Sequence, residues 1–196
     1  MSSPVAAAHA VSPSLADGDG TGVTVWLTGL PSAGKTTVAR AAADRLRRNG
    51  RRVEVLDGDA VREHLSAGLG FSRSDRETNI SRIGFVAELL ARNGVLVLAA
   101  VISPYESARA EVRNQHTSNG VPYLEVHVAA PVEVCSSRDV KGLYARQRAG
   151  QIRGLTGVDD VYEAPVAPDL VLRTESMSLD ESVDSVLALL AERGLL

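Results

Sequence analysis

The stretch of sequence that decides the fold is Val23-Thr-Val-Trp-Leu-Thr-Gly-Leu-Pro-Ser-Ala-Gly-Lys-Thr-Thr37. Its first part, residues 23–27, is an apolar run typical of a buried strand. Residues 29–36 then match the pattern G-x-x-x-x-G-K-[ST], and a helical pattern opens at Thr37. A strand, a loop of this pattern and a helix, in that order, are the setting that a P-loop requires. The stretch therefore predicts a binding site for a phosphate group.

The spacing of this loop follows from the chemistry of phosphate binding. Backbone N–H groups of the loop, and the positive end of the dipole of the helix that starts at Lys35, point at the bound anion. Glycine at 29 and 34 allows close approach, Lys35 reaches the terminal phosphates, and the Thr36 hydroxyl is placed to bind Mg²⁺. The predicted nucleotide-binding residues are Gly29, Leu30, Pro31, Ser32, Ala33, Gly34, Lys35, Thr36 and Thr37.

A chance match in a glycine-rich strand, loop and helix is the alternative interpretation. Glycine is common in this chain, but Lys35 and Lys141 are the only lysines among its 21 lysine and arginine residues. A random match to the pattern is therefore rare, even before the strand and the helix are required. Because arginine replaces lysine nearly everywhere else, both lysines become candidates for tasks that need a compact ammonium group.

Length and composition restrict the class of protein. A chain of 196 residues can bury the core of one domain of ordinary size. Its formal net charge of −3 argues against a nucleic-acid partner, because such proteins usually carry a basic face. Cys135 is the only cysteine, which excludes an intramolecular disulfide and a cysteine zinc cluster and fits a reducing cytoplasm.

The first residues and the hydropathy predict no membrane association. Residues 1–20 are rich in Ala, Ser, Pro and Gly, and they lack the basic start and unbroken apolar core of a secretion signal. No apolar run approaches the roughly 18 residues that a membrane span needs. We expect a disordered tail over 1–20, followed by one domain over 21–196.

Strand and helix patterns alternate along the rest of the chain, which predicts an α/β fold with a parallel sheet flanked by helices. This is the three-layer sandwich of P-loop NTPases, of the nucleotide-kinase-like type. Residues 139–169 break the alternation and predict a mobile lid, with a short helix at 143–149. The further predicted strands are 53–56, 95–102, 122–128 and 170–172, and the predicted helices are 37–49, 60–65, 76–93, 107–119, 132–138 and 179–193.

Polar residues follow the predicted strands and should meet at one edge of the sheet, where such folds bind ligands. Asp57 and Asp59 follow the second strand, and Ser103 follows the third. A carboxylate there can hold Mg²⁺ or accept a proton from an attacking hydroxyl. We select Asp59, with Asp57 as the more structural of the two. The alternative role of Asp59 is the N-cap of the helix over 60–65.

Six separate motifs resemble those of the adenylylsulfate kinase (APS kinase) family, in the same order and over about residues 22–190. Together they are far more specific than a P-loop alone. They are Leu56–Arg62, Leu69–Asn79, Arg82–Gly84, Ile102–Tyr105, Arg138–Tyr144, and Gly154–Asp159 with Tyr162 and Glu163.

The resemblance implies an enzyme of sulfate assimilation that uses MgATP to phosphorylate the ribose 3′-hydroxyl of adenosine 5′-phosphosulfate (APS), giving PAPS. It also implies a cytoplasmic homodimer. Arginine forks suit the doubly anionic phosphosulfate, and an aromatic ring suits a purine. The residues that the resemblance assigns to the substrate are Asp59, Arg62, Phe71, Arg76, Asn79, Ile102, Ser103, Lys141, Leu155 and Thr156, and it places Arg138 over the adenine of ATP.

Within this set, Arg62 and Arg76 have the alternative of being ion-paired helix residues, and Phe71 that of a core residue. The predicted catalytic residues are Lys35, Asp59, Ser103 and Lys141, and the predicted metal-binding residues are Thr36 and Asp59. Some members of the family are assigned a phosphoserine intermediate at the residue matching Ser103. We expect direct in-line transfer instead, because Asp59 can receive the hydroxyl proton.

Three positions depart from the motifs of the family. Ala60 replaces a common asparagine, residues 31–33 read Pro-Ser-Ala where Ser-Gly-Ser is frequent, and Leu155 replaces a phenylalanine that stacks on the substrate adenine. The last change predicts weaker or less selective substrate binding. Two alternatives therefore stay open. One is a related P-loop small-molecule kinase with another acceptor, and the other is a nucleotide-binding regulator without turnover.

Overall fold

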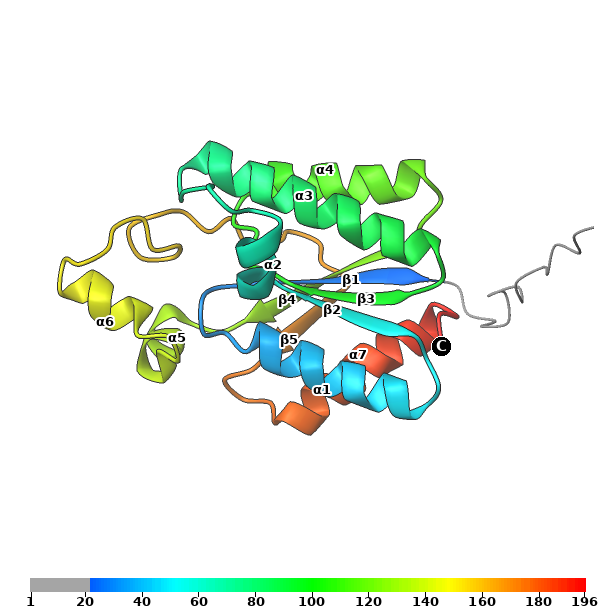
Figure 1. Cartoon of the computed structure of the whole chain (residues 1–196). Coiled ribbons are helices and arrows are strands. Elements are labelled where there is room, and N and C mark those ends of the chain that lie inside the picture. The colour runs from blue at the N-terminus through cyan, green and yellow to red at the C-terminus, as the bar shows by residue number, and fades with distance from the viewer. Residues whose placement is uncertain (1–21) are drawn as a thin grey trace, which may run out of the picture.

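The computed structural model describes residues 22–196, so the tail expected over 1–20 lies outside the described residues. Strands and helices alternate along the described chain (Figure 1). The strands are β1 (Val23–Thr28), β2 (Val53–Asp57), β3 (Leu96–Ala100), β4 (Tyr123–Ala129) and β5 (Leu170–Arg173). The helices are α1 (Lys35–Arg48), α2 (Gly58–His64), α3 (Arg73–Arg92), α4 (Glu106–Ser118), α5 (Val132–Arg138), α6 (Leu143–Arg148) and α7 (Leu179–Glu192).

The five strands form one sheet in the order β2-β3-β1-β4-β5, and every neighbouring pair is parallel. Helices α3 and α4 cover one face of this sheet, and α1 and α7 cover the other (Figure 1). The predicted three-layer α/β architecture is confirmed. In the described part of the chain, no helix combines the length and the apolar character that a membrane crossing would require.

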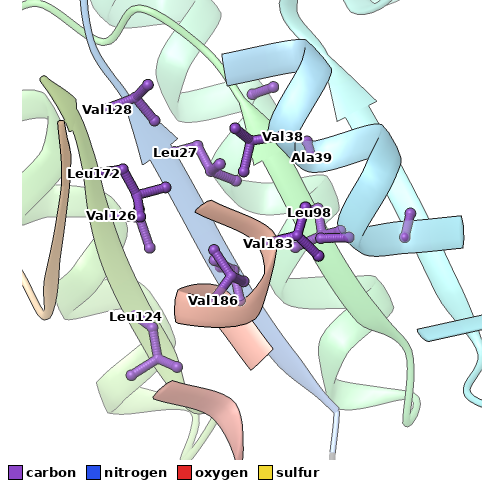
Figure 2. Close-up of a cluster of buried hydrophobic side chains, with 14 of the residues drawn as sticks. Leu27, Val38, Ala39, Leu98, Leu124, Val126, Val128, Leu172, Val183 and Val186 are labelled. Carbon is purple, nitrogen blue, oxygen red and sulfur yellow. The ribbon is translucent and has the colours of Figure 1, made fainter. Parts of the chain in front are cut away.

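Burial on both faces of the sheet explains why its strands are apolar runs. In β1, Val25 and Leu27 point into the cluster under α1 and α7, whereas Trp26 points into the cluster under α3 and α4. All three side chains are fully buried. Figure 2 shows the first cluster, in which Val38 of α1 and Val186 of α7 meet side chains from β1, β3, β4 and β5. Complete burial of each such side chain stabilises the fold by about 1.5–3 kcal/mol.

Helices α2 and α3 begin earlier than predicted, because polar side chains cap them. Ser72 accepts a hydrogen bond from the backbone N–H of Asp75, so α3 starts at Arg73 instead of residue 76. The carboxylate of Asp57 accepts from the backbone N–H of Asp59 at 3.0 Å, so α2 starts at Gly58. The N-cap role suggested for Asp59 is therefore wrong: Asp57, at the end of β2, caps this helix.

Candidate active site

A hollow with a volume of about 560 Å³ lies at the carboxyl ends of the strands. Its walls come from the loop after β1, the start of α2, the residues after β3, the end of α5 and the loop after β5. The cavity size is in the range of small-molecule sites. Segments that are far apart in the sequence therefore converge, as the parallel topology predicts.

The P-loop has the backbone that its glycines permit. A side chain at Gly29 would place its Cβ 2.4 Å from the carbonyl oxygen of Val128, and Gly34 has a φ of 103°. The remaining predicted loop residues divide between two environments. Leu30 and Ala33 are buried in the core, whereas Pro31, Ser32, Gly34, Lys35, Thr36 and Thr37 border the cavity.

The Lys35 ammonium is folded back on its own loop. Its Nζ donates hydrogen bonds to the carbonyl oxygens of Gly29 and Leu30, at 2.9 and 2.8 Å, and the side chain is buried. This burial lowers the pKa of Lys35 to about 7. A phosphate group at the loop would favour the charged form and give the ammonium anionic partners in place of the two carbonyls.

The two aspartates after β2 have different surroundings. Asp57 is buried, caps α2 and lies 3.7 Å from Nη2 of Arg40. Asp59 is exposed, and its carboxylate forms an ion pair with Lys141, which follows α5. The structure thus brings Asp59 and Lys141 together at the cavity, although 82 residues separate them in the sequence.

Oxygen ligands for a magnesium ion are available at the same place. Thr36, Asp57 and Asp59 all border the cavity, and hydroxyl and carboxylate oxygens are hard ligands of the kind Mg²⁺ prefers. The described residues contain no cluster of three acidic, histidine or cysteine ligands. In kinase-type sites the protein supplies one or two ligands, and nucleotide phosphates and water complete the shell.

The residues after β5 form a further wall of the cavity, which was not predicted from the sequence. Arg138 donates from Nη2 to the carbonyl oxygen of Thr174 at 2.6 Å, and the hydroxyl of Thr174 donates to the carbonyl oxygen of Ala33 at 2.8 Å. Met177 and Leu179 continue this wall beyond Thr174. No motif marks residues 174–179 in the sequence, so only the topology, which places the end of β5 beside the P-loop, could have indicated them.

An exposed aromatic ring stands near the opposite end of the predicted site. Phe71 is 68% exposed, which rules out the alternative that it is a core residue. The guanidinium carbon of Arg62 lies 4.4 Å from the centre of its ring, and Arg62 also donates to the carbonyl oxygen of Gly70 at 3.2 Å. Both residues border the cavity. A flat, exposed ring beside a cation is suited to stacking with a purine.

Asn79 borders the cavity with an unsatisfied polar group. Its side chain is buried, and its Oδ1 has no hydrogen-bond partner among the described residues. An unpaired buried amide oxygen is costly unless a donor reaches it. A hydroxyl or amino group of a ligand would satisfy it.

Ser103 lies in a strained and crowded position. Its φ is 41°, and its side chain is 1% exposed, with Oγ accepting a hydrogen bond from the indole Nε1 of Trp26 at 3.0 Å. Arg109 donates to its carbonyl oxygen at 2.8 Å, and the Thr28 hydroxyl donates to the carbonyl oxygen of Ile102 at 2.7 Å. Residues 102 and 103 border the cavity with a backbone that is held from behind.

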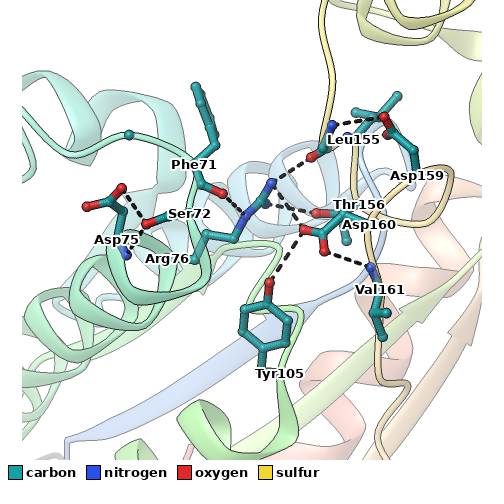
Figure 3. Close-up of polar contacts among 12 residues, drawn as sticks. Phe71, Ser72, Asp75, Arg76, Tyr105, Leu155, Thr156, Asp159, Asp160 and Val161 are labelled. Atoms are coloured by element: carbon teal, nitrogen blue, oxygen red, sulfur yellow. Dashed lines mark hydrogen bonds and ion pairs between the residues drawn. The ribbon is translucent and has the colours of Figure 1, made fainter.

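Arg76 is buried and has several partners within the protein (Figure 3). It donates to the carbonyl oxygen of Phe71 and to the hydroxyl of Thr156, both at 2.9 Å, and it lies 3.3 Å from the Asp160 carboxylate. The ion pair suggested as an alternative for this arginine is thus present. Arg76 also borders the cavity, so it is both ion-paired and accessible to a ligand there.

Leu155 and Thr156, which were predicted as substrate residues, lie behind the cavity wall. Leu155 is 6% exposed and packs in the hydrophobic cluster under α1 and α7. Among the described residues, both lie outside the lining of the cavity, and Thr156 reaches it only through Arg76. The role of Leu155 in the adenine pocket stays a prediction, and its side chain packs in the apolar core of this structure.

A P-loop with a buried lysine, an acidic residue just after β2 and arginines around an exposed ring define a small-molecule phosphotransferase of the P-loop class. The family model for adenylylsulphate kinase matches residues 21–173. The chain belongs to this family.

Individual relatives agree with the family match. A probable adenylyl-sulfate kinase of Synechocystis is 58% identical over 165 residues, which are 84% of this chain and 91% of that protein. The structure of the APS kinase of Mycobacterium tuberculosis in complex with AMPPNP and APS superposes with a TM-score of 0.85 at 44% identity, over 88% of this chain and 99% of that one. A hexameric APS kinase of Thiobacillus denitrificans matches 90% of this chain and 30% of its own at 36% identity, with a TM-score of 0.69.

Proposed function

We propose that this protein transfers the γ-phosphoryl group of ATP to the 3′-hydroxyl of adenosine 5′-phosphosulfate, giving PAPS for sulfate assimilation. The observation that carries the proposal is that one cavity joins Lys35 of the P-loop, Asp59 with Lys141, and the set of Arg62, Phe71 and Arg76. A donor nucleotide and an anionic nucleotide acceptor can therefore meet in one cavity.

ATP occupies the P-loop end of the cavity. Backbone N–H groups of the loop over 29–34, in which Pro31 has none to donate, and the amino terminus of α1 receive its phosphates. Lys35 exchanges its two carbonyl partners for the terminal phosphates. Arg138, held by Thr174, and the apolar Met177 and Leu179 form the wall against which the base of ATP lies.

APS occupies the end of the cavity near α3. The Phe71 ring stacks on its adenine, and the Arg62 and Arg76 guanidinium groups neutralise its phosphosulfate. The unpaired Oδ1 of Asn79 accepts a hydrogen bond from a hydroxyl or amino group of the substrate. Residues 102 and 103 contribute contacts through their fixed backbone.

The transfer is direct and in line. Asp59 accepts the proton of the attacking 3′-hydroxyl, and Lys141 leaves its ion pair with Asp59 to neutralise charge on the transferred group. A covalent relay through Ser103 is disfavoured, since its Oγ is buried and held by Trp26. Thr36 and Asp59 would hold Mg²⁺, whose charge would offset that of the phosphates.

Three further parts of the proposal concern the surroundings of the reaction. Residues 139–169 act as a lid that closes over bound ligands, and protection of this segment from proteolysis by ADP plus APS tests its closure. The protein works in the cytoplasm, where ATP is available and the buried thiol of Cys135 stays reduced. It self-associates as a homodimer through the outer side of α3, which exposes Phe85 and Leu89.

The deciding experiment is a coupled assay with purified protein, ATP, APS and Mg²⁺. Formation of the 3′-phosphorylated product supports the proposal, and its absence rejects it. A thermal-shift panel separates the alternatives by mass action, because the true acceptor stabilises the folded state. APS should raise the melting temperature more than other nucleotides or sugars do. Binding of ATP without turnover on any acceptor would instead favour a regulator.

A further inference from the structure

The segment 154–160 is fastened to the amino-terminal end of α3 by Arg76 (Figure 3). Besides its bonds to Phe71 and Thr156, the guanidinium donates from Nη2 to the carbonyl oxygen of Gly154 at 2.6 Å. Its partners thus come from Phe71, two residues before α3 begins, and from the segment that was predicted as the lid. Hydrogen bonds to Phe71 on one side and to Gly154 and Thr156 on the other therefore fix the plane of the guanidinium.

Asp160 is the only carboxylate within ion-pair distance of Arg76 in the described structure, at 3.3 Å between Oδ2 and Nη2. The carboxylate is itself held in place. Its Oδ1 accepts from the backbone N–H of Val161 at 2.9 Å, and the Tyr105 hydroxyl donates to its Oδ2 at 3.4 Å. Tyr105 is buried and precedes α4, so a third element of the fold fixes the acid.

The two charged groups face different hollows of the protein. Arg76 borders the main cavity, whereas Asp160 borders a second hollow formed with Leu30, Val132 and Tyr162. Asp160 is not among the residues that line the main cavity. We therefore take the side of Arg76 that borders this cavity to be open to a ligand.

We propose that Asp160 is a positioning residue for the acceptor anion, and that it acts through Arg76. This inference rests on the proposed function, because it takes the anion at Arg76 to be the phosphosulfate of APS. A side chain as buried as Arg76 needs an anion beside it, and a guanidinium whose plane is fixed in advance loses little freedom when it binds. Asp160 provides the charge, and Thr156 with Gly154 provides the orientation.

The test is the Asp160→Asn substitution, which removes the charge and keeps one oxygen that can still accept from the backbone N–H of Val161. We expect the KM for APS to rise about 10-fold, in line with other residues that orient a binding group. The KM for ATP and kcat should stay within about twofold of the wild-type values. A merely structural role would lower the melting temperature without separating the two substrates in this way.

A double-mutant cycle shows whether the effect passes through the arginine. In an Arg76→Lys background, which keeps a cation and loses the fork, Asp160→Asn should change the KM for APS less than twofold. A full 10-fold effect in that background would overturn the inference.

The matched control is Asp159→Asn, at the neighbouring acid, whose carboxylate accepts from the backbone N–H groups of Gly154 and Leu155 and leaves the Arg76 ion pair intact. It should raise the KM for APS less than threefold. An effect as large as that of Asp160→Asn would assign the result to loop order and reject the inference.

If the wild type forms no product from APS, the proposed function itself fails. If it is active and Asp160→Asn binds APS normally, only this inference fails.

Discussion

The protonation state of the Lys35 side chain depends on whether a phosphate group is bound beside it. Burial lowers its pKa in the ligand-free protein to about 7, whereas the unfolded chain has the ordinary value of 10.5. Between these two values the unfolded state holds more protons, so the free energy of unfolding of the ligand-free protein rises with pH across the window. Below about pH 7 the cost of a buried ammonium is fully present.

Binding of ATP should reverse this effect, because phosphate oxygens favour the charged amine. At pH 8.5 we expect about one proton to be taken up per ATP bound, since the lysine is mostly neutral before binding and charged after it. Isothermal titration calorimetry in two buffers of different ionisation enthalpy measures this number. The Lys35→Met variant, which matches the chain length without the amine, should show no uptake. A wild-type enthalpy that is independent of the buffer would contradict the prediction.

The ion pair between Asp59 and Lys141 serves chemistry more than stability. The side chains are 65% and 54% exposed, and exposed pairs contribute little to folding. The Asp59→Asn substitution should therefore change the free energy of unfolding by less than about 0.5 kcal/mol, while kcat falls by a factor of about 10²–10⁴. Urea unfolding and steady-state kinetics measure the two effects. Asp44→Asn, at an equally exposed acid paired with Arg47, should alter neither quantity. Unchanged turnover in Asp59→Asn would remove the acid from the mechanism.

At the scale of elements, the packing of α3 on α4 depends on a glycine. A Cβ at Gly84 would lie 2.6 Å from Cγ2 and 3.0 Å from Cγ1 of Val112 on α4. The two helices can therefore pack closely only where α3 has no side chain. Gly84→Ala should lower the free energy of unfolding by about 1 kcal/mol, because overpacking costs about 1–3 kcal/mol and alanine regains about 1 kcal/mol of helix propensity.

Urea denaturation measures this change, and a second substitution gives the control. Val112→Ala removes the two methyl groups that meet the new Cβ, so Gly84→Ala should become neutral or stabilising in that background. A stabilising effect of Gly84→Ala in the wild-type background would show that the contact relaxes without cost.

The elements that could be predicted are those whose signal is local. The strands were predicted within one or two residues at most of their ends, because both faces of the sheet are buried and the apolar runs are continuous. Helix starts were less accurate. The serine three residues before Asp75 is a local sequence signal for a cap, from which the start of α3 could have been predicted. The cap by Asp57 could be predicted only by knowing that β2 ends there.

At the scale of the whole molecule, the sequence predicts which residues share a site better than it predicts their partners. The P-loop, Asp59 and Lys141 were placed together because parallel strands end at one edge of the sheet. The engagement of Arg76 with Asp160, the burial of Leu155 and the wall at Thr174 depend on how residues 139–179 fold back. A segment without periodicity carries no signal for such contacts.

Helix α3 also presents an apolar side to solvent. This side is a candidate contact surface between two copies of the molecule. Ile80 and Ile83 pack inward, whereas Phe85 and Leu89, one turn apart on the outer side, are 55% and 38% exposed. Leu65, at 39% exposure, is linked to this side because Arg82 of α3 donates to its carbonyl oxygen at 2.8 Å. Adjacent exposed apolar residues on a rigid helix favour a symmetric contact with a second copy of the chain.

The proposed homodimer predicts that Phe85→Glu shifts the protein from dimer to monomer, because two copies of the new carboxylate would face each other across a symmetric, desolvated contact. Sedimentation velocity over a range of micromolar concentrations measures the mass. Val166→Glu, at a valine that is 85% exposed in the segment after Asp160, changes charge in the same way away from α3 and should leave the mass unchanged. A wild-type protein that stays monomeric at every concentration, or a Phe85→Glu variant with the wild-type mass, would place the dimer contact elsewhere or exclude it. Because the outer side of α3 lies opposite its contacts with the sheet, the monomeric variant should keep its fold and its circular dichroism spectrum.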